Sequence, residues 1–212
     1  MVPKTELVRI ECVDDTENGA CSLGMSQDLW QKFRCGPRKS IQVAVGSVSC
    51  RAEVYPVESA ERLLLLSRPL AEALLIPLPR LLESFMTSDG TLRLGPVIGI
   101  LMEPYILSRG HVVNIKAGYL ERLAATQCEE PYICYLFQIG DVDFSQRTVK
   151  AAVPAKTDKG DICLSMRKMP LPDVIHNRLF RFRSETTDSF NKLAAMSQSG
   201  EIPMFNPVFV KK

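Results

Sequence analysis

The chain has 212 residues, of which 46% are hydrophobic and 24% charged, and its formal net charge is +2. This length suits one large domain or two small ones, and the composition excludes a mostly disordered chain. The small net charge gives no indication of a nucleic-acid partner, and no apolar run reaches the roughly 18 residues of a membrane-spanning helix. The first residues, MVPKTELVRIECVDD, carry acids where a signal peptide would be apolar, so we expect a cytoplasmic protein with no membrane partner.

Seven cysteines are present, with no spacing that is typical of a metal site. No two form C-x-x-C, and the two histidines lie in no zinc-like pattern. An odd number of cysteines without an export signal favours reduced, partly buried thiols. A catalytic cysteine with a distant histidine is the alternative, although no motif supports it. The cysteines are Cys12, Cys21, Cys35, Cys50, Cys128, Cys134 and Cys163.

Two stretches of the first 94 residues resemble each other, LGMSQDLWQKFRCGP (23–37) and LLLSRPLAEALLIPLP (64–79). Ser26 and Ser67 occupy matching positions and predict helix N-caps, because a serine hydroxyl can accept a free N–H of the first turn. Counted from each serine as the first position, apolar residues follow at the fourth and eighth positions, which indicates one face of a short helix. The matched pairs are Ser26 with Ser67, Leu29 with Leu70, and Phe33 with Leu74.

Each of these helices is followed by a predicted hairpin. SIQVAVGSVSCRAEVYPV turns at Gly46-Ser47, and LLESFMTSDGTLRLGP turns at Asp89-Gly90. Each copy is therefore a strand–helix–strand–strand unit of roughly 40 residues. Two such units can close into a small barrel without open edges. We expect residues 1–94 to form a pseudo-duplicated β-barrel that resembles a double-psi barrel; the alternative is a chance similarity of two amphipathic helices.

After Leu94 the pattern changes to apolar strands that alternate with helical segments. Strands are expected in GPVIGILME, PYICYLFQI, DICLSM, PDVIHN and IPMFNPVF, and helices in VVNIKAGYLERLAATQCEE and TTDSFNKLAAMSQSGE, the last ended by Gly200. Strands that are apolar on both faces are typical of a parallel sheet covered by helices. We therefore expect residues 95–212 to form a Rossmann-like α/β domain.

Polar residues gather where three of these strands end. The stretches are Met102-Glu103-Pro104, Gly140 to Asp143, and Asn177 to Arg181. Ligands bind at the carboxyl edge of such sheets, where loops and helix N-termini meet. An arginine pair there can hold a carboxylate or a phosphate, and Arg178 and Arg181 are the candidates. The alternative for nearby Arg183 is a solvated or weakly paired charge, and Asp141 and Asp143 fit a turn better than a metal site.

Four blocks of the second part resemble the YheC/YheD family of endospore coat-associated proteins of spore-forming bacteria. They occur in the family's order and cover about residues 92–212: LRLGPVIGILME, YLFQIGDVDFSQRTVKA, PLPDVIHNRLFRFRSE and GEIPMFNPVFVKK. Asn177, Arg178 and Arg181 match the family's N-R-x-x-R, while Asp173 matches its P-D and Asn206 its F-N-P. This sequence departs from the family pattern at His176, where tyrosine is more usual, and in VFVKK, which lacks an aspartate.

The resemblance implies a pre-ATP-grasp domain followed by an ATP-grasp domain that binds ATP and magnesium. The lysines and acidic ligands of that second domain are absent from these 212 residues, so we expect no cofactor, catalytic residue or metal site in this chain. We expect a non-catalytic amino-terminal portion of a spore coat-associated, ATP-grasp-like protein of the mother cell. Its task would be to recognise an anionic acceptor or a partner, with Asn177, Arg178, Arg181 and Asp141 as ligand-binding residues.

Two alternatives remain open. The first is a scaffold module of the spore coat, which acts through the barrel surface and binds other coat proteins; exposed apolar residues, around Trp30 for example, would favour it. The second is a fragment of an ATP-dependent carboxylate–amine ligase, whose partner would be a carboxy-terminal ATP-grasp domain.

Overall fold

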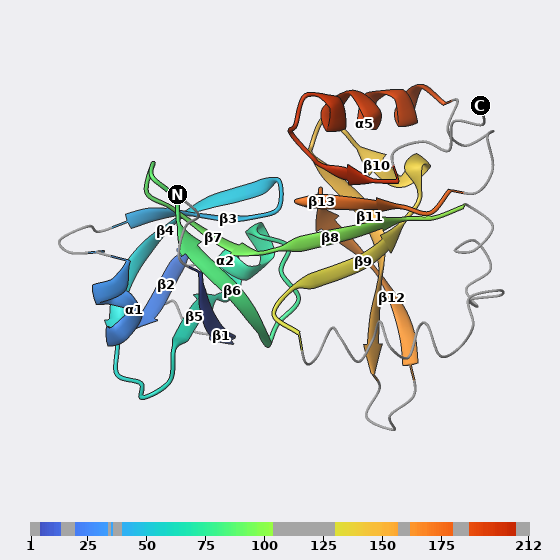
Figure 1. The fold of residues 1–212 in the computed structure, drawn as a ribbon. Coiled ribbons are helices and arrows are strands. Elements are labelled where there is room, and N and C mark those ends of the chain that lie inside the picture. The colour runs from blue at the N-terminus through green and yellow to red at the C-terminus, as the bar shows by residue number, and fades with distance from the viewer. Residues whose placement is uncertain are drawn as a thin grey trace. The chain divides into compact units, whose positions relative to one another are not determined.

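The computed structural model describes residues 5–13, 20–33, 35, 40–103, 130–156, 162–179 and 187–206 (Figure 1). The chain divides into two compact units. The first comprises Met1–Pro96 with Glu130–Tyr132, and the second comprises Val97–Glu129 with Ile133–Lys212. The expected helix in VVNIKAGYLERLAATQCEE and Arg181 lie outside the described residues. The assignment of two domains, 1–94 and 95–212, stays a prediction.

The first unit is a closed barrel of seven strands, in the order β1-β5-β2-β4-β3-β7-β6. Side chains of β1 alternate between the interior and the surface, as the pleat of a strand requires. Leucines, valines and methionines fill the interior, and closure leaves no strand edge unpaired. The predicted barrel is therefore confirmed. Its elements are β1 (Glu6–Val13), β2 (Ser22–Ser26), α1 (Gln27–Lys32), β3 (Ser40–Val45), β4 (Val48–Val57), β5 (Leu63–Ser67), α2 (Arg68–Ala73), β6 (Arg80–Met86) and β7 (Thr91–Gly95).

The internal repeat is present in the order of the elements, β2-α1-β3-β4 followed by β5-α2-β6-β7. The pairing shows an approximate two-fold relation: β4 is parallel to β2 and antiparallel to β3, and β1 is parallel to β5 and antiparallel to β6. The predicted counterpart of β4 was β7, and this assignment is wrong, because β1 occupies the equivalent place. β7 instead fills the gap between β3 and β6 and completes the barrel.

Ser26 and Ser67 stand at the N-caps of α1 and α2, but neither side chain caps its helix. Each hydroxyl instead binds the first strand residue of the other copy. Ser67 Oγ accepts the N–H of Ser22 at 2.9 Å, and Ser26 Oγ accepts the N–H of Leu63 at 3.3 Å. The antiparallel pairing of β2 with β5 explains this, since it places each serine beside the start of the opposite strand. The predicted capping role is therefore wrong, while the matching of the two serines is confirmed.

The second unit contains a mixed sheet of seven strands. Its elements are β8 (Val97–Leu101), β9 (Ile133–Phe137), η1 (Ile139–Asp141), β10 (Val142–Asp143), β11 (Thr148–Lys156), β12 (Ile162–Pro170), β13 (Val174–Asn177), α5 (Asp188–Gln198) and β14 (Met204–Phe205). Four neighbouring strands, β9-β8-β13-β14, are parallel. Antiparallel β10, β11 and β12 extend the sheet beyond β9, so the expectation of a wholly parallel sheet is wrong.

Helix α5 agrees with its predicted boundaries. Thr187 Oγ1 accepts the N–H of Phe190, and Gly200 follows the helix with a φ of +78°, the left-handed conformation that glycine adopts most easily. Phe190 and Leu193 are buried, so the apolar face of the helix lies against the rest of this unit. The predicted strand around Val174 is confirmed as β13.

The amino ends of β8 and β13 are joined by a reciprocal pair of hydrogen bonds. Val97 N–H donates to Asp173 Oδ2 and Asp173 N–H donates to the Val97 carbonyl, both at 2.8 Å. Two residues further along β8, Gly99 lets Pro172 approach, because a Cβ built on Gly99 would lie 2.8 Å from Pro172 Cγ. These contacts fix the register of β8 against β13. They therefore also determine that Leu101 and Asn177 lie opposite each other at the carboxyl ends of the two strands.

Candidate functional site

The predicted strand ends of the second unit meet at one edge of the sheet. In the parallel register, Leu101 of β8 lies opposite both Phe137 of β9 and Asn177 of β13. Two further bonds extend this row: Met102 N–H donates to the Phe137 carbonyl at 2.8 Å, and Arg178 N–H donates to the Leu101 carbonyl at 2.9 Å. We call this edge, with Met102, Glu103, Asn177 and Arg178, the strand-end site.

The strand order indicates why a ligand would bind there. From β8 the chain continues to β9 on one side, then returns past β8 to β13 and β14 on the other side. The connections therefore diverge between β8 and β13, and ligands of open α/β sheets commonly bind outside the carboxyl ends of the strands at such a switch point. Glu103 and Asn177 stand at this place and are both only 2% exposed. Buried polar groups at a switch point are the residues from which a binding site is built.

Asn177 shapes the chain that leaves β13. Its Oδ1 accepts the N–H of Leu179 at 3.0 Å, and Leu179 is itself buried. This short bond turns the backbone directly after the strand, as asparagine side chains commonly do. Arg178, between the two, is half-buried. The structure thus gives Asn177 a positioning role beside Arg178, whereas a direct contact of Asn177 with ligand stays a prediction.

Asp141 lies at the end of β9, in η1, at the same edge of the sheet. Burial raises the pKa of its carboxyl group, and the nearby Lys150 ammonium partly opposes this effect. Asp141 follows β9 and Arg178 follows β13, and β8 lies between these two strands in the sheet. Neighbouring Asp143 makes a turn, as predicted: its Oδ1 accepts the N–H groups of Ser145 and Gln146, each at 3.0 Å.

Two further residues stand together where β13 and β14 end. Asn206 Nδ2 lies 3.3 Å from His176 Nε2, and Asn206 has a φ of +53°, which asparagine tolerates better than most residues. The sequence matched Asn206 to a family motif and marked His176 as a departure from it, but it gave no sign that the two are partners. Their contact depends on the parallel pairing of His176 with Phe205, which only the fold supplies.

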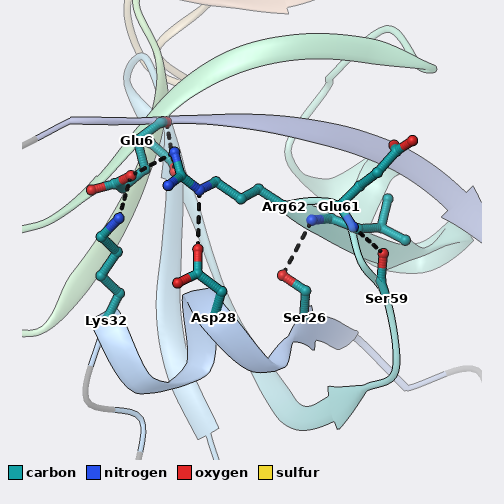
Figure 2. Close-up of polar contacts among 9 residues, drawn as sticks. Glu6, Ser26, Asp28, Lys32, Ser59, Glu61 and Arg62 are labelled. Atoms are coloured by element: carbon teal, nitrogen blue, oxygen red, sulfur yellow. Dashed lines mark hydrogen bonds and ion pairs between the residues drawn. The ribbon is translucent and has the colours of Figure 1, made fainter.

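A second polar cluster lies on the barrel, and it was not predicted from the sequence. Glu6 of β1 is 5% exposed and binds Lys32 Nζ at 2.8 Å and Arg62 Nη1 at 3.2 Å (Figure 2). Figure 2 also shows Arg62 Nε bonded to Asp28 Oδ2, at 3.0 Å. Two cations thus neutralise one buried carboxylate, and the cluster ties α1 and the segment before β5 to the start of β1. The one available signal was that Glu6 occupies an inward position of an alternating strand.

This cluster and the rest of the described chain show no arrangement for metal chemistry. Among the residues that the structure describes, no group of three or more histidine, cysteine, aspartate or glutamate side chains could hold a metal ion. Within the same residues, no helix has the length and apolar character needed to cross a bilayer.

Comparison with known proteins gives one relative and no family model. No protein-family model matches the sequence. The chain is similar to the endospore coat-associated protein YheD of Bacillus subtilis (strain 168), with 22% identity over 175 residues. The match covers 81% of this chain but only 37% of YheD, so the chain spans little more than a third of the length of that relative.

Proposed function

We propose that this protein is a spore coat-associated relative of YheD whose second unit recognises an anionic group at the strand-end site. The similarity to YheD supports the spore coat association. The observation that carries the recognition role is the bond from Arg178 N–H to the Leu101 carbonyl, which fixes Arg178 beside the end of β8. An arginine whose backbone is held at a switch point can offer its guanidinium group to a carboxylate or a phosphate, which such a group binds through paired N–H donors.

The finer architecture is part of the same proposal. The four parallel strands and α5 are consistent with a Rossmann-like, pre-ATP-grasp unit, and the two-fold pairing of the barrel is consistent with a double-psi barrel. In this reading the 212 residues act in recognition and do not catalyse a reaction by themselves. Arg181 would join Arg178 in binding the anion, and Asp141 would stand at the far end of the site.

The test is a titration of the whole chain with inorganic phosphate, acetate and glutamate, followed by nuclear magnetic resonance. We expect at least one anion to shift the amide signals of residues 101–103 and 177–179. Arg178→Ala should weaken this binding about tenfold or more, which corresponds to roughly 1.4 kcal/mol. Arg167→Ala is the matched control, because Arg167 is an exposed arginine on β12 of the same unit.

Two results would count against the proposal. Either no anion of this panel shifts the signals at the strand ends, or Arg178→Ala and Arg167→Ala weaken binding equally. The second result would mean that general surface charge, and not the strand-end site, attracts the anion. The Arg178→Lys variant tests a separate point, the need for paired N–H donors. If it retained binding, a single positive charge at this position would suffice.

The scaffold alternative receives less support. Leu7 and Tyr55 are the exposed large apolar residues of the described barrel, at 46% and 37% exposure. They lie on β1 and β4, which are not neighbours in the barrel. Single exposed apolar residues are normal on protein surfaces, whereas a docking surface needs a contiguous patch.

A further inference from the structure

Two cysteines that are far apart in the sequence face each other on the barrel. Cys21 directly precedes β2, and Cys50 lies on β4, which pairs with β2 in parallel. Their Sγ atoms are 3.5 Å apart, and both residues are only partly buried. Among the cysteines whose side chains the structure describes, which are Cys12, Cys21, Cys35, Cys50 and Cys134, none forms a disulfide. Their pairing could not be predicted from the sequence, because 28 residues separate them.

We propose that Cys21 and Cys50 are a site of reversible oxidation, at which a peroxide converts the two thiols into a disulfide. A disulfide bond is about 2.05 Å long, so the two sulfur atoms need to approach by roughly 1.5 Å. Side-chain rotation can supply a movement of this size at partly exposed positions. The new bond would link the start of β2 to β4 and would close a covalent loop that contains β2, α1 and β3.

The proposal gives the two sulfur atoms different roles. Cys50 Sγ–H can donate to Cys21 Sγ or to the Arg51 carbonyl, each at 3.5 Å, and the first of these bonds joins the two thiols. Burial, together with this bond, raises the pKa of Cys50 to about 11. Cys50 therefore keeps its proton near neutral pH, and the proposal assigns the attack on the oxidant to Cys21.

The reaction balances with hydrogen peroxide as the oxidant. Cys21 loses its proton and attacks one peroxide oxygen; the S–O bond forms, the O–O bond breaks, and the departing hydroxide takes up that proton as water. Cys50 then attacks the sulfenic sulfur of Cys21; the S–S bond forms, the S–O bond breaks, and the hydroxyl leaves with the Cys50 proton as a second water. Two thiols are oxidised and one peroxide is reduced to two waters. A thiol reductant reverses the change by exchange.

For Cys12, Cys35 and Cys134, whose side chains are also described, no such contact with a second cysteine is recorded. Cys35 is buried in the barrel beside Met25 Sδ at 3.8 Å, and Cys134 is buried in β9. Cys12 is exposed on β1, and its Sγ–H donates to the carbonyl of Val13 at 3.9 Å. Cys12 is therefore a matched control: it is more exposed than the pair, so reactivity that followed exposure alone would favour Cys12.

The experiment treats the reduced full-length chain with hydrogen peroxide, then digests it and identifies linked peptides by mass spectrometry. We expect one dominant intramolecular link between the peptides that contain Cys21 and Cys50, and we expect a thiol reductant to remove it. Oxidation should raise the thermal unfolding midpoint by several degrees, because the bond closes a long loop of the unfolded chain. Cys12→Ser should retain both effects, and Cys50→Ser should lose both.

The wild-type peptide map decides the outcome even if a variant folds poorly. Links from Cys21 or Cys50 to Cys12, Cys128 or Cys163 in place of the expected pair would overturn the proposal. So would a map in which both thiols are oxidised only to sulfinic or sulfonic acids without a link. A linked wild-type protein whose midpoint did not rise would overturn the assigned effect on the barrel.

Discussion

At the scale of single residues, the clearest constraint is the missing side chain at Gly99. A Cβ at this position would lie 2.8 Å from Pro172 Cγ and 2.9 Å from Phe137 Cε1, both closer than real Cβ contacts. Pro172 belongs to the segment that leads into β13, and Phe137 belongs to β9. One glycine therefore lets three segments of the second unit pack together, and the strand-end site depends on their register.

We predict that Gly99→Ala lowers the free energy of unfolding by about 1–3 kcal/mol, because the methyl group overpacks a closed core. Without crowding, replacing glycine by alanine in a strand would slightly raise the free energy of unfolding. A lower value for Gly99→Ala would therefore show that crowding by the added methyl group dominates. Gly140→Ala is the matched control, since nothing lies within 4 Å of a Cβ built there. Urea unfolding of both variants measures the difference. Equal stability of Gly99→Ala and wild type would show that Pro172 can move aside at little cost.

The residues of the strand-end site could be predicted only up to a point. Asn177 and Arg178 were found from the sequence because an apolar run ends at them, and the structure places that end beside β8. The turn made by Asn177 onto Leu179 and the contact of His176 with Asn206 could not be predicted. Both depend on backbone positions after a strand ends, where hydrophobic periodicity carries no information. The predicted role of Arg181 falls outside the described residues.

At the scale of elements, the short-range turn signals were reliable, and the helix patterns that fall on described residues formed α1, α2 and α5. Gly46 and Gly90 have φ values of +52° and +84°, and both predicted hairpins form. Of the β11–β12 hairpin, only part of β12 was predicted, in DICLSM, and β11 was not; β11 contains Pro154, a residue that is rare inside strands. That proline is tolerated because β9 pairs with β11 only at Ala152, so Pro154 needs no ladder bond on that side. Pro154 therefore lies beyond the one recorded pair between β9 and β11.

The two serine contacts between the copies give a prediction at this scale. Ser67 Oγ accepts the Ser22 N–H and also donates to the Ala20 carbonyl at 3.1 Å, whereas Ser26 Oγ accepts one longer bond from Leu63. We expect Ser67→Ala to cost about 1–3 kcal/mol of stability, because it leaves the buried N–H of Ser22 without its partner. Ser26→Ala should cost less, because the bond that it removes, from the Leu63 N–H, is longer and only partly buried.

Thermal and urea unfolding of both variants provide the measurement. Ser49→Ala serves as the control, because Ser49 is exposed on β4 and its loss should change stability by less than about 0.5 kcal/mol. If Ser26→Ala proved as costly as Ser67→Ala, the extra bond to Ala20 would contribute nothing. If neither changed stability, water would replace both hydroxyls, and the two serines would not join the copies.

At the scale of the whole molecule, every strand of the barrel comes from the first 96 residues. The segment 130–132 adds two bonds to this unit: Glu83 N–H donates to the Pro131 carbonyl at 3.1 Å, and Arg80 Nη1 donates to the Tyr132 carbonyl at 3.0 Å. Since the barrel closes without that segment, the first unit has its own core and its own complete set of strand pairs. These are the features of a domain that can fold alone.

We therefore predict that a fragment of residues 1–96 folds cooperatively, with stability reduced by about 1–3 kcal/mol for the two lost bonds. Circular dichroism and amide nuclear magnetic resonance measure this directly. A fragment of residues 1–86 is the control: it lacks β7, so β3 and β6 have no strand between them and the barrel stays open. A disordered 1–96 fragment would mean that residues 130–132 are part of the barrel's minimal folding unit, and a well-folded 1–86 fragment would mean that closure by β7 does not govern its stability.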